Sequence, residues 1–245
     1  MNKERYTDSK EALDFKNNKD RDRFYNRMSI EQKELFSSIQ TNIFTYCEAK
    51  AGTGKTVTSM AALLDLLSNG TISKIVYIQK PSERYLSQGY YPGTAEEKAQ
   101  FIFLPFYDAC NTLGLFESTI TKAINDKVFI LTTDSSLRGV NFENAGILVD
   151  ETENCDYRTL KLIFTRIHDS CHVVALGDRL QKDNKGSNTD FIDYCEYMSN
   201  QSFGNKCNLT KNYRGKFSRC AEDFEFKRED KRAKNWRWQR VSNQL

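Results

Sequence analysis

The chain has 245 residues, of which 39% are apolar and 28% are charged, as is typical of an ordinary folded domain. Its 36 basic and 33 acidic residues leave a net charge of +3, which argues against nucleic acid coating the whole surface. No apolar run approaches the roughly 20 residues that span a bilayer, and the charged start lacks a signal-peptide core. The seven cysteines form no CxxC pair. We therefore expect buried thiols, a cytoplasmic location and no membrane partner.

The chain begins with a charged segment and then passes into regular structure. Residues 1–27 are rich in charge and poor in aliphatic side chains, which is typical of a flexible lead or of a peripheral helix that packs weakly. Ser29 and Gln32 have the S-x-x-Q spacing of a capping box, which predicts that a helix begins there. β-Branched and aromatic residues fill 43–47, which predicts a strand that runs directly into the glycine-bearing loop at 49–56.

Helical and strand patterns alternate through the rest of the chain. Apolar residues recur at helical spacing from Met60 to Leu67, and Asn69-Gly70 is typical of a helix end. Another helix is expected to carry Leu160 to Ile167. Nearly continuous apolar runs, which predict buried strands of a parallel sheet, lie at 74–78, 128–131, 147–149 and 173–176. The alternation predicts an α/β fold with a mainly parallel β-sheet flanked by helices.

The segment from Ala49 to Thr56 fits the phosphate-binding pattern G-x-x-x-x-G-K-[ST], with alanine at the first glycine. Gly52 and Gly54 let the backbone curl so that successive N–H groups face an anion, and the following helix adds its positive end. Lys55 is expected to reach the β- and γ-phosphates of ATP, and the Thr56 hydroxyl to bind Mg²⁺. The expected nucleotide-binding residues are Ala51, Gly52, Thr53, Gly54, Lys55, Thr56 and Val57, with Gln32 as a further candidate.

Polar side chains follow two of the predicted strands, at the sheet edge where the phosphate loop also lies. Asp150 would be costly at the end of an apolar strand unless it served a cation, so we expect it to share Mg²⁺ with Thr56. Glu151 is placed to orient or deprotonate an attacking water, which favours hydrolysis over transfer to a second substrate. Gln181 is expected to contact the γ-phosphate or that water. Gln32 has two open interpretations, adenine recognition or closure of the capping box.

Together these residues resemble the PhoH family of P-loop ATPases, which is similar to the first motor domain of superfamily-one helicases. The resemblance covers roughly residues 30–225 and includes the stretch that holds all three prolines. Its distinctive segments are Lys80-Pro81, Gly89-Tyr90-Tyr91-Pro92-Gly93, Glu96-Glu97-Lys98 and Pro105-Phe106-Tyr107-Asp108-Ala109. It implies a RecA-like P-loop NTPase fold with the ATPase domain at 28–225, the charged lead at 1–27 and a basic, tryptophan-containing tail at 226–245.

The resemblance also implies a catalytic arginine and partners. Leu209 to Arg214 is similar to the family's arginine motif, so Arg214 is expected to stabilise charge on the γ-phosphoryl group. A helix-capping role for Arg214 is the alternative. The family implies a homo-oligomeric ring, commonly a hexamer, in which this arginine reaches the neighbour's nucleotide. RNA or single-stranded DNA is the implied polymer, with the tail at 226–245 as a plausible contact.

The resulting prediction is an ATP-hydrolysing enzyme with Lys55, Glu151, Gln181 and Arg214 as catalytic residues, ATP or ADP as ligand and Mg²⁺ as cofactor. A nucleotide-gated assembly or binding module with little turnover is the main alternative. It is favoured by Ala49 and by Glu153, which stands where the family's acidic motif commonly ends in glutamine. A small-molecule kinase is disfavoured by the Asp150-Glu151 pair and by the lack of an obvious lid.

Overall fold

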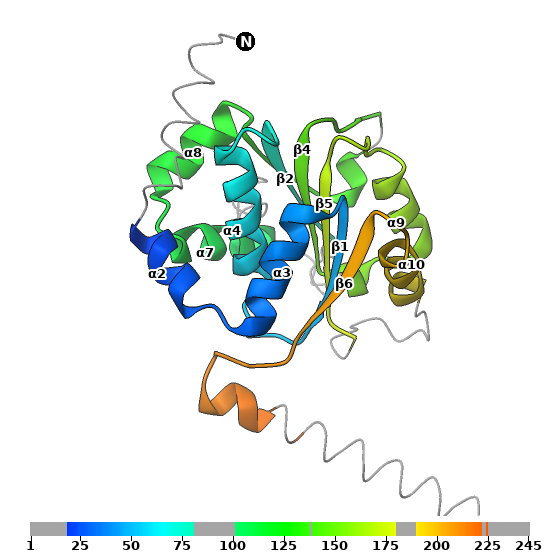
Figure 1. Cartoon of the computed structure of the whole chain (residues 1–245). Coiled ribbons are helices and arrows are strands. Elements are labelled where there is room, and N and C mark those ends of the chain that lie inside the picture. The colour runs from blue at the N-terminus through cyan, green and yellow to red at the C-terminus, as the bar shows by residue number, and fades with distance from the viewer. Residues whose placement is uncertain (1–18, 81–100, 138, 180–189, 222–223, 225–245) are drawn as a thin grey trace, which may run out of the picture.

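The computed structural model describes residues 19–80, 101–137, 139–179, 190–221 and 224, and its centre is a six-stranded sheet (Figure 1). The strand order is β3-β2-β4-β5-β1-β6, and all five pairings are parallel. The strands are β1 (Phe44–Ala49), β2 (Lys74–Gln79), β3 (Phe129–Thr132), β4 (Ala145–Asp150), β5 (His172–Gly177) and β6 (Gly204–Leu209). The predicted α/β fold is confirmed.

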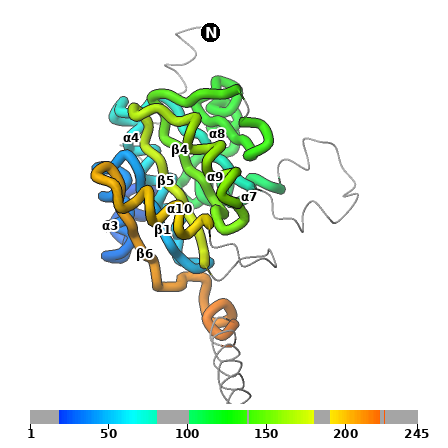
Figure 2. Tube along the Cα trace, turned by 90° about the vertical axis from the view of Figure 1, so that its right-hand side faces the viewer, coloured from blue at the N-terminus to red at the C-terminus, as the bar shows by residue number. Residues whose placement is uncertain are grey.

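Helices cover both faces of the sheet (Figures 1 and 2). One face carries α2 (Lys19–Arg27), α3 (Ile30–Thr41), α4 (Lys55–Ser68), α7 (Leu104–Thr112) and α8 (Glu117–Asn125). The other face carries α9 (Tyr157–Phe164) and α10 (Asp190–Ser199). Two short 3₁₀ turns, η2 (Asp134–Ser136) and η3 (Thr152–Asn154), follow β3 and β4. The result is a three-layer arrangement of helices, sheet and helices.

The two faces of the sheet have separate apolar cores. Side chains alternate along β2, so that Tyr77 packs in the core beneath α4 and α7, whereas Val76 and Ile78 pack in the core beneath α9 and α10. The ring of Tyr77 lies 5.4 Å from that of Phe106 on α7. Burial on both faces explains why the central strands are nearly continuous apolar runs in the sequence.

Two elements differ from the sequence-based expectation. Strand β6 was not predicted because it lies at the sheet edge, and its buried residues Cys207 and Leu209 alternate with polar ones. Helix α9 ends at Phe164, and Ile167 instead pairs with Phe142 in an isolated bridge. Residues 19–27 of the expected lead form helix α2, in agreement with the alternative of a peripheral helix.

Two expectations from the sequence concern the cysteines, expected to be buried thiols, and the membrane, which the chain is not expected to cross. All seven cysteines are free, and six of them are buried. Cys220 is exposed, contrary to expectation, because it lies on the segment after β6 that leads away from the sheet (Figures 1 and 2). Within the described part of the chain, no helix combines the length and the apolar character needed to cross a bilayer.

Candidate active site

The loop between β1 and α4 depends on two glycines with left-handed backbone conformations. Gly52 has φ of 77° and Gly54 has φ of 81°, a region that residues with a Cβ rarely adopt. A Cβ on Gly54 would lie 2.7 Å from the Gln32 amide nitrogen, and one on Gly52 would lie 2.8 Å from Asn212 Oδ1. The loop therefore has the curled backbone expected of a phosphate-binding loop, at the carboxyl end of β1.

Gln32 connects this loop to the start of α3. Its Oε1 accepts a hydrogen bond from the Ser29 backbone N–H at 3.0 Å, and the Ser29 hydroxyl accepts one from the Gln32 backbone, so the predicted capping box is confirmed. The Gln32 Nε2 also donates to the Thr53 carbonyl at 3.0 Å. The side chain thus holds the loop in place, and adenine recognition by Gln32 stays a prediction.

Asp150 is the most heavily hydrogen-bonded carboxylate beside the loop. Its Oδ2 accepts from the Thr56 hydroxyl at 2.9 Å and from the Tyr77 hydroxyl at 2.8 Å. Its Oδ1 accepts from the Glu151 backbone N–H at 2.9 Å. β2 and β4 are neighbours in the sheet, which brings Tyr77 to this position. The side chain is 1% exposed, so its orientation is fixed by these three donors.

The Thr56 and Asp150 oxygens suit a magnesium ion. Mg²⁺ is a hard cation that proteins bind through one or two oxygen side chains, with phosphates and water completing the shell. The hydroxyl and the carboxylate lie in contact and border the same pocket as the loop. No cluster of three or more histidine, cysteine, aspartate or glutamate side chains in the described segments could hold a metal by itself. The pair therefore fits Mg²⁺ that arrives with a nucleotide.

Lys55 is a buried cation surrounded by carboxyl groups. Its side chain is 7% exposed, and its Nζ lies 3.5 Å from the Ala49 carbonyl oxygen. Burial acts to lower the pKa of Lys55, but the carboxyl groups of Asp150, Glu153 and Glu151 more than offset this, so its pKa is raised. Lys55 is therefore charged at neutral pH and borders the pocket where phosphate oxygens would lie.

Glu151 has a strained backbone at the point where β4 ends. Its φ of 55° lies in the left-handed region, which costs a residue other than glycine on the order of 1–3 kcal/mol. Such strain is concentrated at functional sites, where the surrounding structure imposes it. Burial and the neighbouring Asp150 raise the pKa of Glu151, which makes its carboxylate a better proton acceptor.

Glu153 is buried between Glu151 and the end of β5. Its Oε2 accepts from the Asp178 backbone N–H at 3.2 Å, whereas its Oε1 is buried and meets no donor. Burial and the adjacent Glu151 raise the pKa of Glu153 well above its usual range. A proton on Glu153 can be donated to the Glu151 carboxylate, which satisfies both groups. The protonated carboxyl then supplies a donor, as an amide would at this position.

Arg214 lies against the phosphate loop of its own chain. The Tyr213 backbone N–H donates to the Gly52 carbonyl at 2.8 Å, and the Arg214 backbone N–H donates to Asn212 Oδ1 at 2.8 Å. A Cβ on Gly52 would lie 2.9 Å from Arg214 Cγ. Within the single chain, Arg214 borders the pocket because the segment after β6 crosses the loop. The action of Arg214 on the nucleotide of a neighbouring subunit stays a prediction.

These groups border one open pocket of about 840 Å³. The loop and the acidic strand end contribute one wall, with Lys55, Thr56 and Glu151, and Arg214 contributes from the segment after β6. A volume of this size is in the range that accommodates a nucleotide. The expected binding residues Ala51, Gly52, Gly54, Val57 and Gln32 also border it. Thr53 is buried, and its hydroxyl donates to the Lys50 carbonyl at 2.9 Å, so its side chain shapes the loop. Its contact with a nucleotide stays a prediction.

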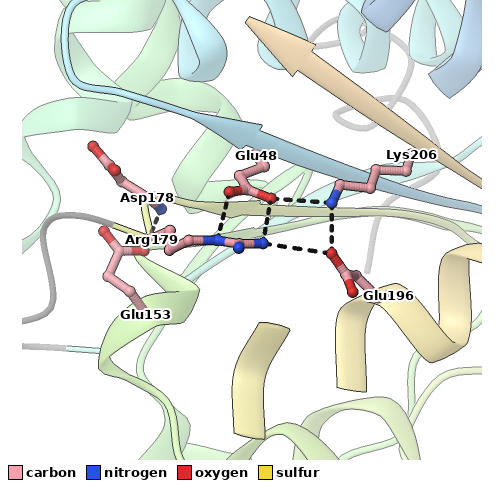
Figure 3. Close-up of polar contacts among 6 residues, drawn as sticks. All are labelled: Glu48, Glu153, Asp178, Arg179, Glu196 and Lys206. Carbon is pink, nitrogen blue, oxygen red and sulfur yellow. Dashed lines mark hydrogen bonds and ion pairs between the residues drawn. The ribbon is translucent and has the colours of Figure 1, made fainter. Parts of the chain in front are cut away.

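An ion-pair network connects β1, β6, α10 and the residue that follows β5 (Figure 3). Arg179, just after β5, contacts Glu48 on β1 through its Nε at 2.9 Å, and also contacts Glu196 on α10 at 3.6 Å. Lys206 on β6 contacts Glu48 at 3.0 Å and Glu196 at 2.6 Å. Hydrogen bonding to Lys206 lowers the pKa of Glu196. The network holds the Arg179 side chain at the end of β5. Gln181 lies outside the described residues, so its role stays a prediction.

Several residues that shape the site were not found from the sequence. Tyr77 carried no signal because it belongs to an apolar strand, and Asn212 lies in the arginine motif but was given no role of its own. Phe24 and Arg27 were assigned to the charged lead, yet both border the pocket.

The comparison with protein families matches residues 26–213, more than half of the chain, to the model described as PhoH-like protein. The chain belongs to the PhoH-like protein family. The RecA-like P-loop NTPase fold expected from the resemblance is thereby confirmed, together with the parallel sheet and the loop between β1 and α4.

Family relatives match over part of their length. A PhoH-like protein of Mycobacterium leprae is 28% identical over 158 residues, which are 64% of this chain and 45% of that protein. A PhoH-like protein of Bacillus subtilis is 26% identical over 152 residues, covering 62% of this chain and 47% of that protein. Protein PhoH of Escherichia coli K12 is 28% identical over 154 residues, covering 62% and 43%. The chain therefore spans less than half the length of these relatives.

Among solved structures, the helicase domain of Pyrococcus furiosus Hef is similar over 78% of this chain and 40% of that chain. The TM-score is 0.47 and the sequence identity is 14%.

Proposed function

We propose that this family member binds and hydrolyses ATP with Mg²⁺. The observation that carries the proposal is the contact between Thr56 and Asp150 beside a loop whose Lys55 is buried and charged. This is the arrangement that a nucleotide with its metal requires, since one wall supplies donors for the phosphates and the other supplies oxygen ligands.

Each residue has a distinct task in the proposed reaction. The loop N–H groups and Lys55 bind the phosphates, while Thr56 and Asp150 would hold Mg²⁺, which neutralises charge on the β- and γ-phosphates. Glu151 orients the attacking water and accepts its proton. Arg214 stabilises the charge on the γ-phosphoryl oxygens in the transition state. Gln181 is proposed to contact the same phosphate or water.

The proposal extends to partners and location. A motor or remodeller acting on RNA or single-stranded DNA is supported by the family resemblance, with the basic tail at 226–245 as the proposed contact. Self-association into a ring, with a hexamer as the expected form, rests on the same resemblance. A cytoplasmic location is consistent with seven free thiols. The domain limits at 28 and 225 are part of this proposal.

The test is phosphate release from Mg·ATP in three parallel reactions, with no polymer, with single-stranded RNA and with single-stranded DNA. The unaltered chain should release phosphate, and one polymer should increase the rate. Glu151→Gln should abolish release in all three reactions. Equal and negligible release by the two proteins in every reaction would contradict the ATPase proposal.

A second function is favoured by the Glu151 and Glu153 pair. Two adjacent buried carboxyls retain a proton readily, and a protonated Glu151 could not accept one from water. In that case the chain would bind ATP with little turnover and act as a nucleotide-gated assembly module. Nucleotide-dependent self-association without phosphate release would distinguish this module from the ATPase.

A further inference from the structure

Helix α2 is fixed in place at three points. The Arg21 guanidinium lies 2.6 Å from Asp65 on α4, and this ion pair is partly buried. The Tyr25 ring meets the Phe36 ring on α3 edge-on, with centroids 5.1 Å apart. At the other end, the side chain of Asp20 lies so close to Gly114 that a Cβ there would be 2.6 Å from a carboxylate oxygen. These contacts tie α2 to α3, to α4 and to the turn after α7.

The pocket extends from the phosphate loop to a cleft between α2 and α7, which lie near each other in Figure 1. Phe24 and Arg27 border it from α2, and Asp108 and Thr112 border it from α7. Phe24 is partly buried against the core, whereas Arg27, Asp108 and Thr112 are exposed. The Arg27 side chain borders the pocket and is exposed, and within the described residues it has no side-chain hydrogen bond or ion pair.

The chemistry of this cleft differs from that of the loop. Phe24 and Arg27 are three residues apart on one helix, so their side chains lie on the same side. A phenyl ring and a guanidinium plane both stack on a nucleobase, and stacking tolerates any base. Across the cleft, the Asp108 carboxylate is an acceptor for two ribose hydroxyls, and the Thr112 hydroxyl adds a second polar contact.

The phosphates belong at the opposite end of the pocket. In the proposed function, Glu151 and Arg214 lie beside the γ-phosphate at that end. The segment after β6 also packs directly on Gly52. The nucleoside must therefore extend toward the walls that carry no catalytic group. We propose that the cleft between α2 and α7 is a nucleoside-binding subsite, with Arg27 stacking on the base and Asp108 accepting from the ribose. This inference rests on the proposed nucleotide-binding function.

The test compares the affinity of the full chain for Mg·ATP and for Mg·tripolyphosphate, which lacks the nucleoside. Arg27→Ala should weaken ATP binding about fivefold and leave tripolyphosphate binding within about twofold, because a stacking contact is lost and no phosphate contact changes. Asp108→Asn should show the same selectivity. Arg23→Ala is the matched control, since Arg23 lies on the same helix outside the pocket and is exposed. It should change neither affinity.

Two results would overturn the subsite. The first is an unchanged ATP affinity in both the Arg27 and the Asp108 variants. The second is an equal loss of ATP and tripolyphosphate affinity in Arg27→Ala, which would make Arg27 a phosphate contact. An unaltered chain that binds neither ligand would instead contradict the proposed nucleotide-binding function, and with it the subsite. All of these substitutions are at exposed positions, so the folded core is retained.

Discussion

At the scale of single residues, the sequence predicts that Asp150 belongs to a cation site, but it does not predict which side chains orient Asp150. An acidic residue ending an apolar strand predicts a cation site because a buried charge needs a partner. This argument does not identify Tyr77, because tyrosine is common in strands. Tyr77 is brought to Asp150 only by the pairing of β2 with β4. Its hydroxyl nevertheless orients the Asp150 carboxylate at 2.8 Å.

Tyr77→Phe tests this orienting contact. Removing a hydrogen bond to a metal-binding carboxylate typically weakens metal affinity, and we expect the Mg²⁺ concentration for half-maximal hydrolysis to rise about tenfold. Tyr46→Phe is the matched control, because the Tyr46 hydroxyl is buried without a hydrogen-bond partner in the described structure. It should leave the Mg²⁺ requirement unchanged. Identical Mg²⁺ curves for the unaltered chain and Tyr77→Phe would remove Tyr77 from the site.

Glu153→Gln tests the role of the shared proton. When Glu153 is protonated, it can donate to the Glu151 carboxylate, whereas two ionised carboxylates at these positions repel each other. The pKa of Glu153 is raised, so the donor is present below that pKa and is lost as the pH rises through it. Activity of the unaltered chain should therefore fall at alkaline pH, whereas the glutamine variant keeps its donor and its activity. Superimposable alkaline limbs in the two pH profiles would contradict this account.

At the scale of elements, the limits of α3 and α4 follow from local signals. The capping box begins α3, and Asn69 caps the end of α4 before Gly70, which has φ of 78°. These signals are predictable because the interactions are within one turn of the chain. The hydrogen bond from Gln32 on α3 to the Thr53 carbonyl joins two residues that are 21 positions apart in the sequence, so no local sequence pattern predicts it.

Comparing Gln32→Ala with Ser29→Ala distinguishes the effect of the Gln32–Thr53 hydrogen bond from the effect of the helix cap. Ser29→Ala removes the cap, at a cost of about 1 kcal/mol of stability, but retains the contact with Thr53. We expect only Gln32→Ala to weaken nucleotide binding, and to weaken ATP and GTP equally, because it loosens the loop. The measurement is the Kd of each nucleotide. A loss confined to ATP would show instead that Gln32 recognises adenine.

At the scale of the whole molecule, the question is which chain completes the pocket. The motif that contains Arg214 is visible in the sequence, but whether it acts within its own chain depends on the path after β6. That path crosses Gly52, whose carbonyl accepts a hydrogen bond from the Tyr213 backbone N–H, and the Asn212 side-chain Oδ1 accepts one from the Arg214 backbone N–H. Edge strand β6 lacks a continuous apolar run, so neither its position nor this path was predicted.

Mixing two inactive variants shows whether Arg214 acts on the nucleotide of its own chain or on that of a neighbouring subunit. Glu151→Gln keeps Arg214, and Arg214→Ala keeps Glu151. If Arg214 serves its own pocket, every chain in the mixture lacks one group and phosphate release stays at the level of the variants. Arg214→Ala alone should retain ATP binding but turn over about 10³-fold more slowly, as expected for the loss of a γ-phosphate arginine. Recovery of activity on mixing would show that Arg214 acts on a neighbouring subunit.

The most direct test of the central claim is the fate of ATP bound to the chain. Protein in excess is incubated with Mg·ATP and quenched, and bound ATP and ADP are separated and quantified. We predict that the unaltered chain converts ATP to ADP in a single turnover, whereas Glu151→Gln binds ATP with similar affinity and keeps it intact. Bound ATP that persists equally in both proteins would contradict hydrolysis at this site.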